Sequence, residues 1–75
     1  MYHRITIDRQ QMNGEPCVRG LRIPVATILT LIAEGHTHEQ VLQFYPDLVI
    51  EDIHECLAFA AETMRERQLP LEKVG

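Results

Sequence analysis

The sequence predicts a mainly α-helical fold, a three-helix helix-turn-helix bundle preceded by a short N-terminal β-strand arm. First, 75 residues, of which 45% are hydrophobic, are enough for one small domain and too few for two. Second, three segments carry apolar residues at helical spacing, and prolines and glycines separate them. Third, the turn between the second and third segments is short, as in helix-turn-helix domains. We expect a single domain made of the strand arm (1–24), the bundle (25–67) and a C-terminal tail (68–75).

The arm is expected to contain two extended segments. Ile5-Thr6-Ile7 alternates apolar and polar residues, which is typical of a short strand. Residues 16–25 contain two prolines, so we expect a second extended segment that pairs with the first and turns at Gly20. Pro24 is expected at or near the first position of the next helix, where its missing N–H costs nothing.

The first helix is predicted over Val25–Glu34, and Gly35 can cap it in a left-handed conformation. Its apolar residues sweep roughly 220° of the helical wheel, whereas a surface helix needs only about 100°. One face can pack on its own domain, and the other is expected to pack on a second copy of the chain. Because a core of this size rarely supplies more than about 3–5 kcal/mol, we expect a homodimer. The predicted dimer interface contains Ala26, Leu29, Leu31 and Ala33.

The second helix has clear signals at both ends. Thr37 and Gln40 form a predicted capping box, in which each side chain accepts the backbone N–H of the other residue. The helix then runs to about Tyr45, because Pro46 cannot continue it.

The third helix is predicted from about Ile50 to about Arg67. A stripe about 140° wide supplies an ordinary core face, made of Ile50, Ile53, Cys56, Leu57, Ala60, Ala61 and Met64. The carboxylates of its first turns are expected to be solvated and to favour the positive end of the helix dipole; they are Glu51, Asp52 and Glu55. Phe59 projects opposite the core stripe, and we expect it either to pack under the N-terminal arm or to contact a partner.

The charge distribution argues against a strongly basic nucleic-acid-binding protein. The net charge is −4 and the pI is 5.4, far below the value above about 9 expected of such domains. Residues 1–24 nevertheless carry +2, whereas residues 25–75 carry −6. Carboxylates at the start of the third helix would repel DNA phosphates if that helix entered the major groove. Contacts with nucleic acid or an acidic partner are therefore expected from Arg4, Arg9, Arg19 and Arg22.

No pattern in the sequence is typical of a catalytic or metal site. His36 and His38 are expected to be solvated, because no third zinc ligand stands at a suitable spacing. Cys56 falls on the core stripe, and Cys17 is expected to be partly exposed without a base to activate it. We therefore predict a non-enzyme without cofactor or metal. The widely spaced cysteines, together with the lack of a signal peptide or a bilayer-length apolar stretch, predict a cytoplasmic protein that does not bind membranes.

Residues 13–25 resemble the signature Gly-Gly-Lys-Pro-x-Ile-x-Gly-Thr-Arg-Ile-Pro-Val of a short bacterial family, domain of unknown function 433. The resemblance covers roughly residues 4–62, and further blocks follow in register: Glu34-Gly35, Tyr45-Pro46-Asp47-Leu48, Glu51-Asp52-Ile53 and Leu57-Ala58-Phe59-Ala60-Ala61-Glu62. Among the departures, Glu15 replaces a basic residue. Val49 replaces the threonine that would cap the third helix, which is expected to cost about 1 kcal/mol.

The resemblance implies a homeodomain-like helix-turn-helix fold with an added N-terminal strand region. It also implies an antitoxin-like protein of a type II toxin–antitoxin system, which binds and neutralises a PIN-like ribonuclease, with operator DNA as a further candidate ligand. The alternatives are a stand-alone helix-turn-helix transcription regulator and a protein-interaction module that binds no nucleic acid.

Two roles remain open for the arginines beside Gly20. Arg19 or Arg22 would dock on the acidic, metal-binding site of the nuclease, since a guanidinium pairs well with carboxylates. Alternatively, they form internal ion pairs with Glu51, Asp52 or Glu55 that clamp the arm onto the third helix.

Overall fold

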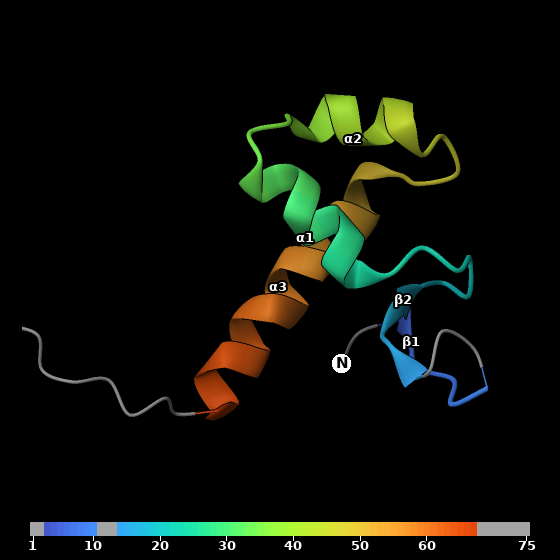
Figure 1. Ribbon diagram of the computed structural model, residues 1–75, viewed down its shortest axis with the longest axis vertical. Coiled ribbons are helices and arrows are strands. Elements are labelled where there is room, and N and C mark those ends of the chain that lie inside the picture. Colours follow the sequence, from blue (N-terminus) through green and yellow to red (C-terminus); the bar gives the residue numbers. More distant parts are fainter. Residues whose placement is uncertain (1–2, 11–13, 68–75) are drawn as a thin grey trace, which may run out of the picture.

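The computed structural model describes residues 3–10 and 14–67, in which a short strand arm precedes three helices (Figure 1). The predicted mainly helical fold is therefore confirmed. The tail expected at 68–75 lies outside the described residues. None of the described helices combines the length and the apolar character needed to cross a bilayer. The elements are β1 (Ile5–Thr6), β2 (Cys17–Val18), α1 (Val25–Ala33), α2 (His38–Phe44) and α3 (Ile50–Arg67).

The arm is a small antiparallel sheet. β1 pairs with β2 such that Ile5 lies opposite Val18 and Thr6 lies opposite Cys17. This confirms the predicted pairing of the two extended segments. The first strand is one residue shorter than predicted: Ile7 lies outside it, and its side chain is 62% exposed.

After β2 the chain turns back sharply and runs alongside this strand as far as α1. The turn is closed by the Leu21 N–H, which donates to the Val18 carbonyl oxygen at 2.8 Å. Its two central residues, Arg19 and Gly20, have positive φ angles of 47° and 72°. Glycine adopts this backbone freely, whereas a residue with a side chain is disfavoured there by about 1–2 kcal/mol. The turn predicted at Gly20 is thus confirmed, and Arg19 shares its strain.

Local signals set the ends of α1. The helix begins after Pro24, which has no N–H to leave unpaired. It is terminated by Gly35, whose φ is 99°. The His36 N–H donates to the Leu31 carbonyl at 3.1 Å, and the Gly35 N–H donates to the Ile32 carbonyl at 3.0 Å. This pair of bonds is a Schellman motif, so the predicted glycine cap is confirmed.

α2 begins with the predicted capping box. The Gln40 N–H donates to the Thr37 hydroxyl at 3.0 Å, and the Thr37 N–H donates to the Gln40 side chain at 2.9 Å. The helix ends before Pro46, also as predicted. Residues 45–49 then form the short turn into α3, and Leu48 within this turn is buried.

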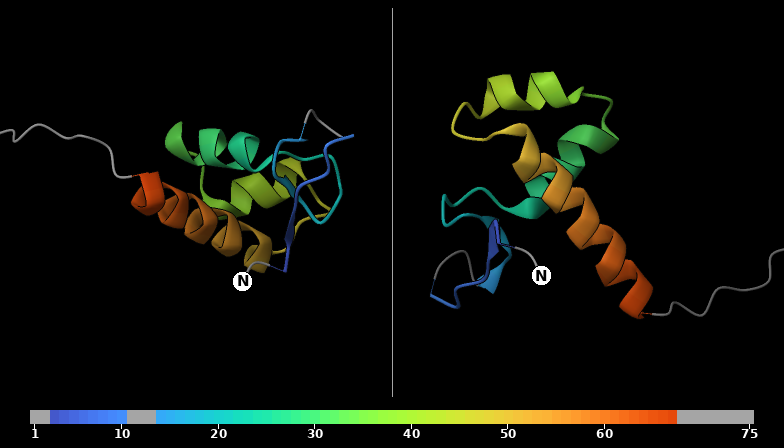
Figure 2. Two further views of the ribbon diagram at one scale, coloured as in Figure 1. Left: turned by 90° about the horizontal axis from the view of Figure 1, so that it is seen from below. Right: turned by 180° about the vertical axis from the view of Figure 1, so that it is seen from behind.

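The core lies where α1 crosses α3, with α2 packed against both helices (Figures 1 and 2). β2, the three helices and the turn before α3 each supply buried side chains to it: Val18, Val25, Ile28, Val41, Leu48, Ile53 and Cys56. Cys17 is also buried, at 2% exposure, so the expectation of a partly exposed thiol was wrong. The reason is that Cys17 lies between two neighbours in the sheet, opposite Thr6 on one side and Pro24 on the other.

The apolar stripe of α3 is covered over only part of its length. Ile53 and Cys56 are buried, but Ala61 is exposed and Met64 is 53% exposed. The expectation of one continuous core face was therefore wrong for the second half of the helix. α3 has 18 residues and spans about 27 Å, whereas α1 has nine and spans about 14 Å. The C-terminal half of α3 consequently extends past the helix that covers its first half (Figure 1).

Candidate functional site

The carboxylate of Asp52, in the first turn of α3, is the centre of a buried polar cluster. Its side chain is fully shielded from solvent. Its Oδ2 atom accepts the backbone N–H of Val49 at 2.9 Å, and so caps the start of the helix from within. This is the reciprocal half of a capping box, in which the side chain of the third helical residue accepts the N–H of the capping residue. The other half is missing because valine has no side-chain oxygen, so the expected cost of Val49 stays a prediction.

Arg19 makes the most extensive contact with this carboxylate. Its Nε donates to Oδ1 of Asp52 and its Nη2 donates to Oδ2, both at 3.0 Å. The same Nη2 also donates to the carbonyl oxygen of Asp47 at 2.8 Å, just before α3. The positive φ of Arg19 turns its side chain toward α3 in this bidentate geometry. Two parallel charge-assisted hydrogen bonds are among the strongest polar contacts in proteins.

Arg4 ties the other strand of the arm to the same helix. Its Nη1 donates to Oδ1 of Asp52 at 3.2 Å, and its backbone N–H donates to Glu55 Oε2 at 2.8 Å. The Arg19 N–H donates to the Arg4 carbonyl at 2.7 Å, which joins the two arginines through the backbone. Both strands of the arm are therefore held on the N-terminal half of α3 by one carboxylate and its neighbour.

The electrostatics of the cluster favour the ionised form of Asp52. Burial alone would raise the pKa of this carboxyl, but the hydrogen bonds from Arg19, the Val49 N–H and Arg4 outweigh burial and lower it. The hydrogen bond to Asp52 likewise raises the pKa of Arg19. Nearby, burial together with the charges of Asp52 and Glu55 raises the pKa of the Cys56 thiol to about 11. Neither Asp52 nor Cys56 is suited to proton transfer near neutral pH.

These contacts decide what Arg19 and Arg4 do within the chain. Of the two roles left open for Arg19, the internal ion pair with Asp52 is present, and Arg4 joins it. The expectation that Asp52 is solvated was wrong, because two guanidiniums and a backbone donor stabilise its charge away from water. The sequence alone indicates Asp52 only as one of three candidate acids. Its position three residues after Val49, which has no capping oxygen, was the signal that could have singled it out.

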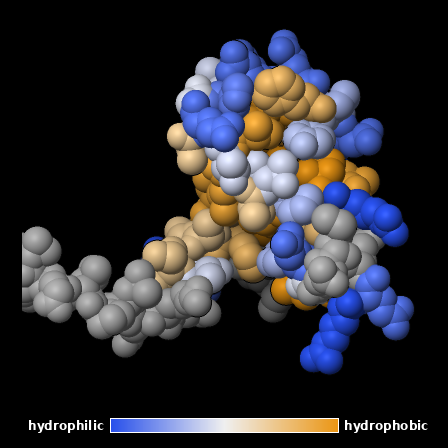
Figure 3. Space-filling view, viewed as in Figure 1, coloured by the Kyte–Doolittle hydropathy of each residue, from blue (hydrophilic) through white to orange (hydrophobic). Residues whose placement is uncertain are grey.

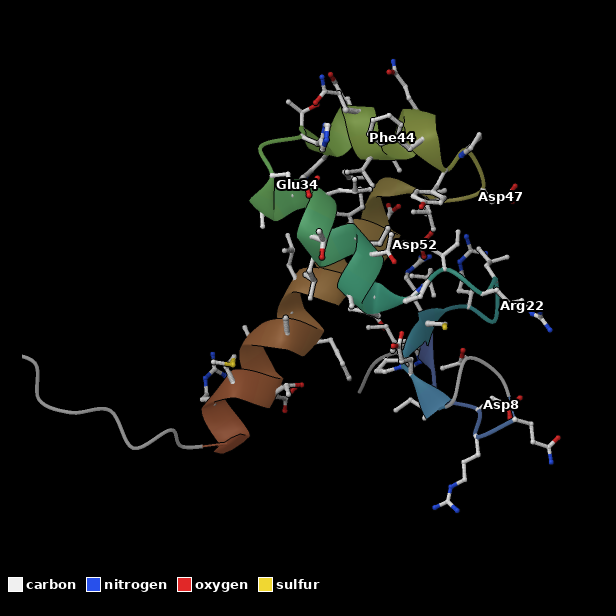
Figure 4. All side chains as sticks on the ribbon, in the orientation of Figure 1. Asp8, Arg22, Glu34, Phe44, Asp47 and Asp52 are labelled. Carbon is white, nitrogen blue, oxygen red and sulfur yellow. The ribbon has the colours of Figure 1, made fainter. Side chains whose placement is uncertain are left out.

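Arg22 lies on the same turn but outside the cluster. It is exposed, it has a positive φ of 65°, and it points away from the body of the molecule (Figure 4). Arg9 is also exposed, in the loop after β1. Of the four predicted binding arginines, Arg4 and Arg19 thus support the arm, while Arg9 and Arg22 present their charges to solvent.

A largely apolar groove of about 350 Å³ lies between α1 and the exposed half of α3. Ala26 and Leu29 line it from α1, Phe59 and Met64 line it from α3, and Pro16 lines it from the arm. Phe59 is half-buried and packs against the core, so the expectation that it projects opposite the core face was wrong. In Figure 3, the strongly hydrophilic residues gather over α2 and the loops of the arm, whereas the surface around α1 is more apolar.

The predicted dimer interface lies only partly on the exposed surface of α1, because Leu29 and Leu31 also pack against the core of the same chain. Ala26 and Ala33 are exposed, and Leu29 and Leu31 are half-buried. The homodimer itself stays a prediction.

The histidines do not converge on a metal site. The His36 ring meets the Phe44 ring edge-on at 5.2 Å, and the His38 ring faces the His54 ring at 5.9 Å. Within residues 3–10 and 14–67, no three histidine, cysteine or carboxylate side chains are grouped as metal ligands would be.

Comparison with known proteins identifies relatives without an assigned activity. The chain is 34% identical over 65 residues to the uncharacterized protein y4eO of Sinorhizobium fredii, and the match covers 85% of this chain and 29% of that protein. The fold is similar to the crystal structure of a DUF433 member protein from Anabaena variabilis, with a TM-score of 0.78 and 25% identity over 84% of this chain and 62% of that one. This chain therefore spans less than two thirds of either relative.

The family described as "Protein of unknown function (DUF433)" matches residues 5–60. The matched range begins at β1, includes the turn that carries Arg19 and Arg22, and ends in the middle of α3. It thus contains the arm, the Asp52 cluster and the crossing of α1 with α3. On this match, which confirms the resemblance seen in the sequence, the chain belongs to the DUF433 family.

Proposed function

We propose that this chain is the antitoxin-like component of a bacterial type II toxin–antitoxin system, and that it binds and neutralises a PIN-like ribonuclease in the cytoplasm. The observation that most supports this proposal is the exposed Arg22 guanidinium on a turn fixed to α3. Arg19, three residues earlier, ties the turn to the buried Asp52. A charge on a fixed turn loses little conformational entropy on binding, which favours affinity.

Arg22 would act by competing for carboxylates. A PIN-like nuclease binds its metal ions through acidic side chains, and a guanidinium can pair bidentately with the same groups. Docking of Arg22 would neutralise these carboxylates and block the approach of metal and RNA. In this mechanism Arg4 and Arg19 are positioning residues, because they hold the turn and do not touch the nuclease.

The charge distribution favours a protein partner over DNA as the ligand of the isolated chain. Arg4 and Arg19 are engaged by Asp52, whereas Arg9 and Arg22 of the arm and Arg65 of α3 are exposed. Glu51 is exposed at the start of α3, where a recognition helix would meet the phosphates. Affinity for DNA depends on the number of phosphates neutralised, so a net charge of −4, with exposed arginines on different elements, predicts weak binding. Operator binding is accordingly proposed only for the complex with the nuclease.

The proposal expects a neighbouring reading frame to encode a small PIN-like nuclease, and the test is inhibition of that purified nuclease, with RNA cleavage as the readout. We expect the chain to inhibit cleavage at a stoichiometric ratio. Arg22→Ala should weaken inhibition by about 10-fold to 100-fold, as for loss of a charged hydrogen-bond partner, without changing the melting temperature. Arg65→Ala removes an equally exposed arginine from a different element and should inhibit like the parent chain.

Three results would contradict the proposal at different points. Failure to bind the nuclease at micromolar concentrations would refute the antitoxin-like function. Full inhibition by Arg22→Ala would leave that function standing but refute the docking role of Arg22. A strongly salt-dependent mobility shift of operator DNA by the chain alone would favour the stand-alone transcription regulator.

A further inference from the structure

The turn that carries Arg22 has a backbone that its own residues do not favour. Arg19 and Gly20 have positive φ angles of 47° and 72°, which is the pattern of a type I′ turn, and Arg22 follows with a φ of 65°. An arginine that precedes a glycine fits a type II turn instead, in which the φ of the arginine would be negative. Strained backbone of this kind persists only where neighbouring groups fix it. Contacts from outside the turn therefore select this conformation.

Two consecutive amides of the turn donate hydrogen bonds to the segment that contains β1. The Arg19 N–H donates to the Arg4 carbonyl at 2.7 Å, and the Gly20 N–H donates to the side-chain hydroxyl of Thr6 at 3.1 Å. A backbone carbonyl is present whatever the residue, whereas a hydroxyl depends on the residue type. Thr6 is thus the point at which the sequence of β1 influences the conformation of the turn.

The surroundings of Thr6 suit its hydroxyl to this role. Thr6 lies opposite Cys17 in the sheet, and its hydroxyl donates to the Cys17 carbonyl at 3.5 Å. A hydroxyl has one hydrogen and two lone pairs, so donation in that direction leaves the oxygen able to accept from Gly20. The side chain of Thr6 is exposed, whereas its neighbour Ile5 packs against the core. Packing of the core therefore does not require this hydroxyl, but the turn uses it.

Arg22 depends on this contact because it lies two residues after Gly20 on the same turn. Its side chain points away from the body of the molecule (Figure 4), so the backbone that carries it sets its direction. A backbone that exchanged between turn conformations would present the charge in several directions and would lose more entropy on binding. One neutral hydrogen bond shifts such an equilibrium by about 3-fold to 10-fold.

We propose that Thr6 is a positioning residue, whose hydroxyl holds the turn in the conformation that presents Arg22 to the carboxylates of the nuclease. This inference rests on the proposed function and adds a determinant of affinity that lies in β1, outside the turn. The requirement is a hydroxyl at this position, which serine also supplies. Valine nearly keeps the shape of threonine but lacks the oxygen, and it is favoured in strands, so Thr6→Val should keep β1 paired.

The first test uses the chain alone and measures the hydrogen-exchange rate of the Gly20 amide by nuclear magnetic resonance. Thr6→Val should raise this rate about 3-fold to 10-fold, and Thr6→Ser should keep it within about 2-fold of the parent rate. The Gln40 amide is the internal reference, because it donates to the Thr37 hydroxyl at the start of α2 and should not respond. An unchanged Gly20 rate in Thr6→Val would overturn the role of Thr6, whatever the nuclease does.

The second test measures inhibition of the PIN-like nuclease in a double-mutant cycle. Thr6→Val should weaken inhibition about 3-fold to 10-fold, and Thr6→Ser should inhibit like the parent chain. Because Thr6 acts through Arg22, Thr6→Val should weaken inhibition by less than about 2-fold in the Arg22→Ala background. Thr30→Val is the matched control, since Thr30 is an exposed threonine on α1, outside the turn, and should inhibit like the parent chain.

The outcomes separate this inference from the proposed function. A parent chain that does not inhibit the nuclease would overturn both. Equal losses from Thr6→Val in the parent and Arg22→Ala backgrounds would leave the proposed function standing but overturn the positioning role, because Thr6 would then act without Arg22. A loss in Thr6→Ser as large as that in Thr6→Val would also overturn it, since the hydroxyl would then not be the determinant.

Discussion

Replacement of Asp52 by asparagine would remove the charge at the centre of the buried cluster while nearly preserving the side chain's shape. Four hydrogen bonds reach this carboxylate, three from guanidiniums and one from the Val49 N–H. Breaking a fully buried ion pair costs about 3–5 kcal/mol. Here the side chains of Arg4 and Arg19 remain 35% and 37% exposed, so water can solvate the guanidiniums after the ion pairs are lost and reduce this cost. We therefore expect Asp52→Asn to cost about 2–3 kcal/mol.

This free energy is large for so small a domain. One kcal/mol corresponds to about 4–8 °C in Tm for a domain of 60–100 residues, so Asp52→Asn should lower Tm by about 10–20 °C at pH 7. Thermal unfolding followed by circular dichroism measures this difference. Glu51→Gln is the control, because Glu51 is exposed in the same helical turn and its change should stay within about 0.5 kcal/mol.

The difference in Tm between the parent chain and Asp52→Asn should depend on pH. The pKa of Asp52 is lower in the folded chain than its ordinary value, so the charged carboxylate stabilises the fold above the unfolded pKa of about 3.9. This stabilisation is lost as the pH falls through the folded pKa. The Tm gap between the parent chain and Asp52→Asn should therefore be constant above about pH 5 and narrow below about pH 4. A gap under about 2 °C at pH 7, or one that widens in acid, would refute the assigned role of Asp52.

Three further predictions concern the turn, the thiols and the α2 cap. Arg22→Gly should raise stability by up to about 1 kcal/mol, because glycine relieves the positive φ, while it weakens nuclease inhibition; a lower Tm would contradict this. Cys17 and Cys56 are buried and have raised pKa values, so iodoacetamide at pH 7.5 should label neither in the folded chain and both in urea, as seen by mass spectrometry. Thr37→Ala should cost about 1 kcal/mol in chemical denaturation, and no change would argue against the capping box.

The helices were predictable because their signals are local. Thr37 and Gln40 are three residues apart, Gly35 lies two residues after the end of α1, and Pro46 lies two residues after the end of α2. Each of these residues acts on backbone groups within one turn of itself. The bounds of α3, Ile50–Arg67, also follow from spacing along a single segment. Contacts between residues within one helical turn can be predicted from the local sequence.

The polar cluster could be predicted only as one of several pairings. Asp52 lies 33 residues from Arg19 and 48 from Arg4. From the sequence alone, Glu51, Asp52 and Glu55 were equally possible partners for these arginines. The choice among them depends on how the arm crosses α3, which is a tertiary property. The uncovered half of α3 was missed for a related reason. Helical spacing identifies an apolar face, but the length of the neighbouring helix decides how much of that face is covered.

The position of Val18 has a consequence for any attempt to shorten this protein. Val18 belongs to the arm, yet it is completely buried and is part of the same core cluster as Val25, Ile28 and Ile53. A fragment that began at residue 25 would retain all three helices but lose the core contacts of Val18 and leave the Asp52 charge without its arginine partners. The helices and the preceding strands therefore form one indivisible folding unit, and the isolated bundle is not a meaningful substitute for it.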